Sequence, residues 1–157
     1  MANMTAAIAN RGYYYTPHIV KEIDSKDNLV GQQFREKNTI SIDSANFEPV
    51  VEGMRLVVNG DEHATARWIA IRDIEVCGKT GTAENPHGED HSIFVAFAPA
   101  DDPQIAIAGY VEGTGFGSTY AAPAASLMIE KYLKGEISNP WLEDFILKEV
   151  KESAEEN

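Results

Sequence analysis

Apolar residues at helical spacing predict a helix between positions 43 and 60. Asp43 or Ser44 can cap its first turn, and Gly60 can end it. Pro49 fits the first turn, because its missing N–H group costs little there. The apolar residues that share this spacing are Phe47, Val50, Val51, Met54, Val57 and Val58.

Three later segments have the composition of strands, namely Ile74–Ala83, His91–Ala100 and Gln104–Glu112. The tetrapeptide ADDP joins the last two segments and predicts a hairpin turn. Both segments of this hairpin are almost continuously apolar instead of alternating. We therefore expect helices to cover both faces of the sheet.

Helices are also expected at both ends of the chain. The alanine-rich segment Met1–Gly12 favours a helix, as does Tyr120–Lys134, which is followed by Gly135. The remaining tail contains an amphipathic stretch at Trp141–Val150. The pattern thus predicts an α+β fold in which helices flank an antiparallel sheet.

Two short extended segments are expected between the first helix and position 43. Aromatic and β-branched residues favour a strand over Tyr13–Ile23 despite Pro17, and a second extended segment is expected over Asn38–Ile42. Polar residues 25–28 predict a turn between them. The three tyrosines at 13–15 could line a ligand cleft, but aromatic residues on a strand more often serve packing.

The charge balance disfavours two classes of partner. The chain has 13 basic and 25 acidic side chains, a formal net charge of −12. It lacks the basic patch that displaces counterions from nucleic acid, and an anionic membrane surface would repel it.

Cys77 is the only cysteine, so an internal disulfide is excluded. The longest apolar stretches are too short to span a bilayer, and the first residues lack the basic region of a signal peptide.

The strongest chemical signal is Lys79-Thr80-Gly81-Thr82, in the first of the three strands. Because side chains alternate along a strand, Thr80 and Thr82 share one face, and Lys79 and Gly81 share the other. Two hydroxyl groups at this spacing can bind a carboxylate, and the ammonium of Lys79 adds charge. Gly81 leaves room for a substrate or another backbone. In an edge strand, free backbone groups could also pair with an extended peptide. Alone, four residues are equally compatible with an exposed polar strand end.

This tetrapeptide resembles the K-T-G box of penicillin-binding proteins and β-lactamases. Over roughly residues 1–135 the chain resembles the C-terminal part of class B penicillin-binding proteins, most of all the elongation-type penicillin-binding protein 2. Residues 136–157 form a tail outside the resemblance. The matching segments are MANMTAAIANRGYYYTPHIVKEI, VVEGMRLVVNG, VCGKTGTAENPHGEDHSIFVAFAP and GFGSTYAAPAASLMIEKYLKG. The resemblance implies part of the transpeptidase fold that penicillin-binding proteins share with β-lactamases.

The resemblance also implies roles for these residues. Lys79 would assist the nucleophile electrostatically, while Thr80 and Thr82 would bind the carboxylate of a stem peptide or a β-lactam. The backbone N–H of Thr82 would form half of the oxyanion hole. Gly81 would keep the strand open to the ligand. The implied catalytic residues are therefore Lys79 and Thr82.

A full-length relative would be a serine D,D-transpeptidase that cross-links peptidoglycan stem peptides by acyl transfer. The resemblance implies neither a metal nor an organic cofactor. It implies a location at the periplasmic face of the inner membrane, and membrane proteins of the elongation machinery as partners.

The nucleophile motif of the family, S-x-x-K, does not occur in the 157 residues. A formal match to the second family motif, S-x-N, occurs at Ser44-Ala45-Asn46. In the family this motif precedes the segment that resembles AAIANRGYYYTP, whereas here the match follows that segment. We therefore interpret it as a helix cap. The chain also begins directly with a helix. We therefore expect a part of a longer protein, inactive on its own because the catalytic serine is absent.

Two alternative functions are compatible with the sequence. A β-lactamase or a β-lactam sensor would share the K-T-G box and differ in the fate of the acyl-enzyme. A non-catalytic binding or scaffold module from a truncated gene would explain the absent serine. Similarity around the first helix and around residues 47–60 favours the transpeptidase.

Two further patterns are given structural interpretations. His87, Glu89, Asp90, His91 and the nearby Cys77 could suggest a metal site, but a solvated loop is the preferred interpretation. The glycines at 113, 115 and 117 do not match the spacing of a dinucleotide-binding loop. They are interpreted as a flexible turn near the substrate groove.

The strand Gln104–Glu112 carries a prediction about association. In the family, the corresponding strand pairs with strands that precede this segment. Its outer edge is therefore expected to be unpaired here and to promote self-association. The tail at Trp141–Val150 is the alternative cover for this edge.

Overall fold

Three antiparallel strands form the central sheet of the computed structural model, which describes residues 1–20 and 34–155. They are β3 (Cys77–Ala83), β4 (His91–Ala98) and β5 (Ile105–Val111), in the order β3-β4-β5. The predicted hairpin is confirmed, and its strands end within two residues of the expected positions. β3 begins later than expected, because a bridge between Ile71 and Ile74 closes a tight turn just before it.

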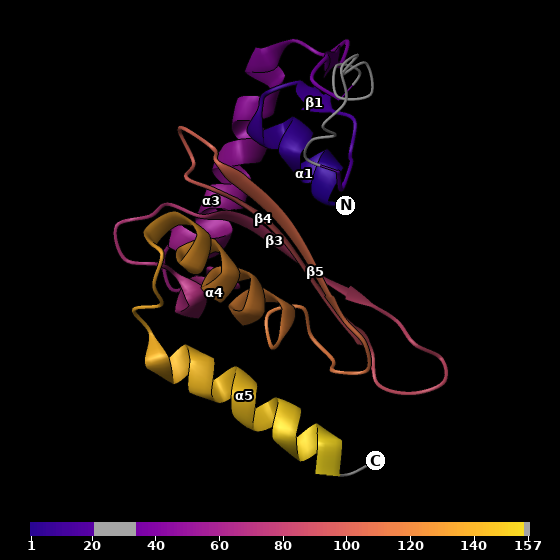
Figure 1. Cartoon of the computed structure of the whole chain (residues 1–157), viewed down its shortest axis with the longest axis vertical. Coiled ribbons are helices and arrows are strands. Elements are labelled where there is room, and N and C mark those ends of the chain that lie inside the picture. Colours follow the sequence, from indigo (N-terminus) through magenta and orange to yellow (C-terminus); the bar gives the residue numbers. More distant parts are fainter. Residues whose placement is uncertain (21–33, 156–157) are drawn as a thin grey trace.

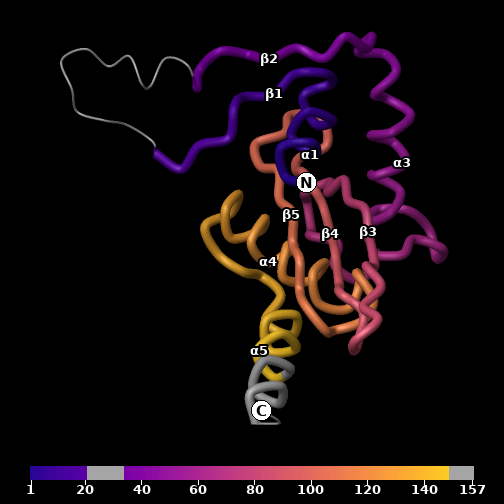
Figure 2. The backbone as a smooth tube through the Cα atoms, turned by 90° about the vertical axis from the view of Figure 1, so that its right-hand side faces the viewer, coloured from indigo at the N-terminus to yellow at the C-terminus, as the bar shows by residue number. Residues whose placement is uncertain are grey.

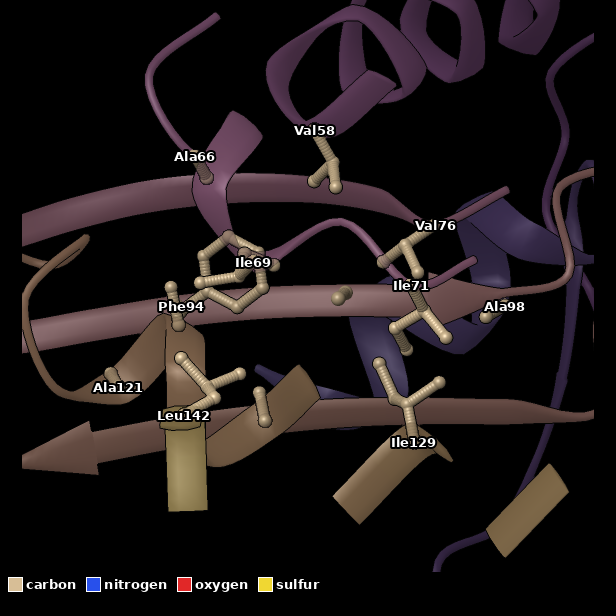
Figure 3. Packing of buried hydrophobic residues seen from close by; sticks show 13 residues of the cluster. Val58, Ala66, Ile69, Ile71, Val76, Phe94, Ala98, Ala121, Ile129 and Leu142 are labelled. Atoms are coloured by element: carbon tan, nitrogen blue, oxygen red, sulfur yellow. The ribbon is translucent and has the colours of Figure 1, made fainter. Parts of the chain in front are cut away.

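Helix α4 (Ala121–Lys134) covers one face of the sheet, as the sequence predicts (Figure 1). Gly135, with a φ of 78°, ends it in the left-handed conformation that favours glycine. The absence of a side chain at Gly109 lets α4 approach β5, since a Cβ there would lie 3.3 Å from the Ala121 carbonyl oxygen. Apolar side chains from the helix and from β4 fill the main core, including Phe94, Ala96, Ala98, Ala125 and Ile129 (Figure 3).

Helix α1 (Ala2–Ala9) covers only one end of the opposite face. A second core forms there, in which Ala9 packs with Cys77 and Phe97. Ile93 and Val95 lie further along the same face and stay half-buried, and the Tyr110 side chain is 48% exposed. The expectation that helices cover both faces therefore holds for one face and for one end of the other. With eight residues, α1 extends only about 12 Å.

Helix α3 (Glu48–Asn59) lies beside β3, on the side away from β4 (Figure 2). A 3₁₀ turn, η1 (Ser44–Phe47), precedes it, so the α-helix begins later than the apolar spacing suggests. The Asp43 carboxylate accepts a hydrogen bond from the Ala45 N–H at 2.9 Å, which identifies Asp43 as the cap of this turn. Val58 of α3 belongs to the main core, whereas Val51 belongs to the second core.

Helix α5 (Pro140–Glu155) is longer than the stretch that the sequence indicates, and it follows α4 at the C-terminal end (Figure 1). Leu142 is 2% exposed and belongs to the main core. Trp68, from the short turn η2 (Arg67–Ile69), lies edge-on to Trp141 and Phe145, with ring centroids 6.1 and 5.8 Å away. Among the described residues, no helix is long and apolar enough to cross a membrane.

A separate two-stranded sheet lies near α1. It consists of β1 (Tyr13–Tyr15) and β2 (Lys37–Thr39), which pair antiparallel. The rings of Tyr13 and Tyr15 meet edge to face at 6.0 Å, consistent with the packing interpretation of the tyrosines. β1 is shorter than expected and ends before Pro17. The remainder of that predicted strand at 21–23, and the predicted turn at 25–28, lie outside the described residues.

Candidate functional site

The Lys79-Thr80-Gly81-Thr82 segment lies on an edge strand, β3, of the three-stranded sheet. Two hydrogen bonds show which backbone groups face away from β4. The Val76 carbonyl oxygen accepts from Asn59 Nδ2 on α3 (2.7 Å), and the Thr80 carbonyl oxygen accepts from Lys79 Nζ (2.7 Å). Backbone groups of successive residues alternate in direction along an antiparallel strand. The N–H and C=O groups of Thr82 therefore also point away from β4.

Helix α3 occupies only the first part of this edge. Gly78 lies against the helix, since a Cβ there would be 3.2 Å from Val58 Cγ2. Further along the strand, Lys79 and Thr82 are exposed, and Thr80 is half-buried. Within the described ranges no strand pairs with this side of β3. The edge at Thr80 and Thr82 is consequently accessible to an extended ligand.

The predicted alternation of side chains along this strand is confirmed. A Cβ at Gly78 would contact Phe94, whose ring lies in the core under α4, so Gly78, Thr80 and Thr82 face that side. A Cβ at Gly81 would instead contact the Ile93 side chain on the opposite face. Neither threonine hydroxyl donates a hydrogen bond to another residue that the structure describes. Both hydroxyl groups are therefore available as donors to a ligand.

The loop between β5 and α4 is anchored at its start by Asp90 and by His91, the first residue of β4. The Gly113 N–H donates to His91 Nδ1 at 3.0 Å. The N–H groups of Thr114 and Gly115 donate to the Asp90 carbonyl oxygen at 2.9 and 2.7 Å. Gly113 and Gly115 have φ angles of 63° and 78°, which glycine adopts without strain. The loop is therefore held at several points, although the sequence suggested a flexible turn.

The same loop then reaches β3, where it touches the candidate site. The Gly117 N–H donates to Thr82 Oγ1 at 3.4 Å. Gly117 is buried against the strand, and a Cβ there would lie 2.1 Å from the Gly81 carbonyl oxygen. This close approach depends on the missing side chain of Gly117 and not on that of Gly81, because a Cβ at Gly81 would lie on the opposite face and meet Ile93. The neighbouring Phe116 side chain is 73% exposed beside this contact. The glycine spacing was the only sequence signal for this arrangement.

The residues considered as metal ligands are not gathered in one place. Cys77 is fully buried at the start of β3 and pairs with Phe97, whereas His91 pairs with Ala83 at the other end of the strand. Burial raises the pKa of the Cys77 thiol to about 12, so it stays protonated. His91 already uses Nδ1 as an acceptor for Gly113. Among the described residues, no group of three or more His, Cys, Asp or Glu side chains could hold a metal ion.

Ser44-Ala45-Asn46 does not approach the Lys79–Thr82 strand. Ser44 lies in η1 and lines a hollow with Arg11 and Asp101. Asp101 is in the turn between β4 and β5, at the opposite end of the sheet from Thr82. The segment does begin a 3₁₀ turn, but the interpretation of Ser44 as its cap is wrong, because the Asp43 carboxylate caps this turn.

The antiparallel sheet with Lys79-Thr80-Gly81-Thr82 on its edge strand is found in a known protein family. The family model described as "Penicillin binding protein transpeptidase domain" matches residues 1–130. The chain belongs to this family. The resemblance drawn from the sequence and the partial α+β transpeptidase fold that it implied are both confirmed.

Several curated relatives are named peptidoglycan D,D-transpeptidases. The chain is 30% identical over 154 residues to MrdA of Haemophilus influenzae, covering 85% of this chain and 23% of MrdA. It is 32% identical over 151 residues to PbpA of Mycobacterium tuberculosis, covering 86% of this chain and 29% of PbpA. The chain thus spans about a quarter of the length of these relatives.

Solved structures of penicillin-binding proteins share the fold. The structure of Pseudomonas aeruginosa PBP2 in complex with WCK 5153 matches with a TM-score of 0.71 and 36% identity, covering 89% of this chain and 31% of that chain. The imipenem acyl-enzyme of penicillin-binding protein A from M. tuberculosis matches with a TM-score of 0.68 and 30% identity, covering 84% of this chain and 29% of that chain.

Proposed function

We propose that this segment forms one wall of the active site of a peptidoglycan D,D-transpeptidase, which cross-links stem peptides by serine acyl transfer and binds β-lactams. The observation that carries the proposal is the accessible edge of β3. There, two threonine hydroxyl groups that donate to no other described residue, an ammonium group and the backbone N–H of Thr82 occur within four residues.

The hydroxyl groups of Thr80 and Thr82 bind the carboxylate of the stem peptide or of the β-lactam. They lie on the same face of the strand, two residues apart, which suits the two oxygens of one carboxylate. Lys79 Nζ lies at the same edge, as its bond to the Thr80 carbonyl oxygen shows. Its positive charge favours an anionic ligand and stabilises negative charge near the nucleophile.

The backbone N–H of Thr82 supplies half of the oxyanion hole. A ligand that pairs with the edge of β3 places a carbonyl group next to this N–H. When serine attacks that carbonyl, negative charge develops on the oxygen, and a donor already in place stabilises it. Gly81 leaves the opposite face of the strand without a side chain at this point.

The serine nucleophile and the other half of the oxyanion hole come from another part of a longer protein. No S-x-x-K sequence occurs among these 157 residues. The isolated chain therefore forms no acyl-enzyme, and by itself it is at most a binding module. The names of the relatives favour a transpeptidase over a β-lactamase or a β-lactam sensor. As in the family, the longer protein works at the periplasmic face of the inner membrane with proteins of the elongation machinery.

The carboxylate role is tested in the longer protein by Thr80→Val and Thr82→Val, which remove a hydroxyl group with little change in volume. Because each hydroxyl bonds to a charged group, we expect each variant to slow acylation by a carboxylate β-lactam by about tenfold. Acylation by the methyl ester of the same β-lactam should change little. Thr39→Val, on β2, is the matched control. Equal losses with the acid and with the ester would contradict the proposed role.

A second experiment tests the isolated chain. The 157-residue protein is incubated with a fluorescent penicillin, and its intact mass is measured. No mass increase is expected, because the chain has no S-x-x-K nucleophile. A stoichiometric adduct would disprove this part of the proposal.

A further inference from the structure

We propose that His91 is a positioning residue for Thr82, and that protonation of the His91 imidazole removes one of the contacts that hold the loop that orients the Thr82 hydroxyl group. This inference rests on the proposed function, in which Thr82 binds the ligand carboxylate. It assigns to His91 a role that reaches the site through the loop between β5 and α4.

His91 holds the first residue of that loop. Its Nδ1 atom accepts the Gly113 N–H at 3.0 Å. An imidazole nitrogen accepts a hydrogen bond only when it carries no proton, so this bond requires the neutral ring. The ring also packs against Tyr110 of β5, with centroids 5.4 Å apart. His91 is therefore fixed in the orientation that this acceptor role needs.

The loop transmits this constraint to Thr82. It is tied to the start of β4 by the His91 and Asp90 contacts, and four residues after Gly113 the Gly117 N–H donates to Thr82 Oγ1. Both ends of this short segment therefore bind neighbouring residues of the sheet, since His91 pairs with Ala83, the residue after Thr82. Figure 1 shows that the β3–β4 loop and the β5–α4 loop lie at the same end of the sheet.

The bond from Gly117 determines what the Thr82 hydroxyl can do. A hydroxyl group has two acceptor positions and one proton to donate. Because Gly117 occupies one acceptor position, the O–H proton points elsewhere, and no described residue accepts it. The hydroxyl is thereby prepared to donate to a carboxylate at the edge of β3. If the loop moves away, the hydroxyl rotates freely and binds the carboxylate less well.

Protonation of His91 breaks its hydrogen bond with the Gly113 N–H. An imidazolium has two N–H donors and no acceptor, so it faces the Gly113 N–H with another donor. Histidine is the side chain whose charge ordinarily changes between about pH 5 and 8. The other titratable groups near it are Tyr110 and Asp90, together with Glu84 and Glu112 at the adjoining strand ends. Ligand binding should therefore weaken when the His91 imidazole is protonated.

Two substitutions of His91 distinguish the loss of the hydrogen-bond acceptor at Nδ1 from the gain of positive charge on the ring. His91→Asn keeps an acceptor near the position of Nδ1 and does not titrate. His91→Phe keeps an aromatic ring against Tyr110 but has no acceptor. In the 157-residue chain, the amide resonances of Gly113 and Gly117 are followed by NMR between pH 5 and 8. We expect them to shift together with the imidazole resonances in the wild-type protein, and to show no such transition in either variant.

The same variants are then acylated by a carboxylate β-lactam in the longer protein. The wild-type rate should fall by about three- to tenfold when His91 is protonated, the effect of one lost hydrogen bond. His91→Asn should keep the high rate at every pH, and His91→Phe should show the low rate at every pH. The methyl ester should show little of this dependence.

Two results would overturn the inference. One is a His91→Phe protein with the wild-type rate and pH profile. The other is a Gly117 amide that does not respond to the titration of His91. The proposed function fails separately, because its test is the difference between acid and ester in Thr82→Val, whereas the NMR titration uses no ligand.

Discussion

Lys79 Nζ lies 2.7 Å from the Thr80 carbonyl oxygen at the accessible edge of β3. We expect Lys79→Ala to slow acylation of the longer protein by about 10²–10³-fold, the loss typical of removing one preorganised group that stabilises developing charge. The measurement is the second-order rate constant for acylation by a fluorescent penicillin. Lys37→Ala on β2 is the control for loss of one positive charge. A rate within about twofold of wild type would exclude a catalytic role for Lys79.

Glu130 is the clearest case of a buried charge with a structural role. The residue is 3% exposed, and its carboxylate accepts hydrogen bonds from the N–H and hydroxyl groups of Ser138 and from Lys134 Nζ. Burial raises the pKa of Glu130, but these hydrogen bonds outweigh it, and the pKa lies below its ordinary value near 4.5. The carboxylate thus joins α4 to the segment that leads into α5.

The depressed pKa of Glu130 gives a pH dependence with a definite sign. The carboxylate stabilises the fold fully above its unfolded pKa, and this contribution is lost as the pH falls through the lower, folded pKa. We expect Glu130→Gln to reduce the free energy of unfolding at pH 7 by about 1.5–3 kcal/mol. The difference from wild type should shrink in urea titrations at or below about pH 4. A difference that stays constant with pH would show that the charge of Glu130 is not involved.

At the scale of elements, the contact between the β5–α4 loop and β3 depends on the absence of a side chain at Gly117. A Cβ there would lie 2.1 Å from the Gly81 carbonyl oxygen. Gly117→Ala should therefore displace the loop and lower the free energy of unfolding by about 1–3 kcal/mol. The measurement is thermal unfolding, combined with the NMR shift of the Thr82 amide.

Gly53→Ala is the matched control for Gly117→Ala. Gly53 lies within α3, and a Cβ there would meet no atom within 4 Å. Alanine favours a helix more than glycine does, so this variant should be about 0.5–1 kcal/mol more stable. If Gly117→Ala were as stable as Gly53→Ala, the close approach of the loop to β3 would be wrong.

Local patterns in the sequence predict most of the elements but not their boundaries. The hairpin of β4 and β5 and the helix α4 follow from apolar runs that end at turn-forming residues. The start of β3 was misplaced, because the bridge between Ile71 and Ile74 closes a turn that apolar composition does not reveal. The sequence also does not predict that α1 covers only one end of the sheet. The apolar pattern of a strand indicates that a face is buried, but it does not indicate which element covers that face.

The candidate site was predictable only in part, for a similar reason. The alternation along a strand places Thr80 and Thr82 on one face, and the structure agrees. The contact of Gly117 with Thr82 joins residues 35 positions apart, and that of Gly113 with His91 joins residues 22 apart. Such contacts depend on how strands and loops meet in space, which one sequence does not specify.

For the whole molecule, the outer edge of β5 carries a prediction of self-association. β5 is an edge strand of the described three-stranded sheet. On the face of the sheet opposite α4, the neighbouring residues Ile93 and Val95 are only half-buried. α5, the alternative cover suggested by the sequence, instead packs its aromatic residues against Trp68 and Tyr120. An unpaired, apolar edge gains hydrogen bonds and buried area by pairing with a second copy. We expect sedimentation at rising concentration to show dimers or larger species.

Ala108→Lys is the variant that tests this association. Ala108 pairs with Val95, on the partly covered face, so a lysine there adds charge to the edge without entering the main core. Ile107 is unsuitable, because it packs against the main core. Met128→Lys, at a side chain that is 61% exposed on α4, makes the same change in charge away from the edge. Equal association of both variants and the wild type would show that the β5 edge is not the interface.

The most direct test of the central claim is a crystal structure of the longer protein acylated by a carboxylate β-lactam. The account predicts that the ligand carboxylate lies within hydrogen-bond distance of the Thr80 and Thr82 hydroxyl groups. It also predicts that the Thr82 N–H donates to the carbonyl oxygen of the acyl group. An acylated structure in which the carboxylate and the acyl oxygen bind elsewhere, with the edge of β3 free of ligand, would contradict it.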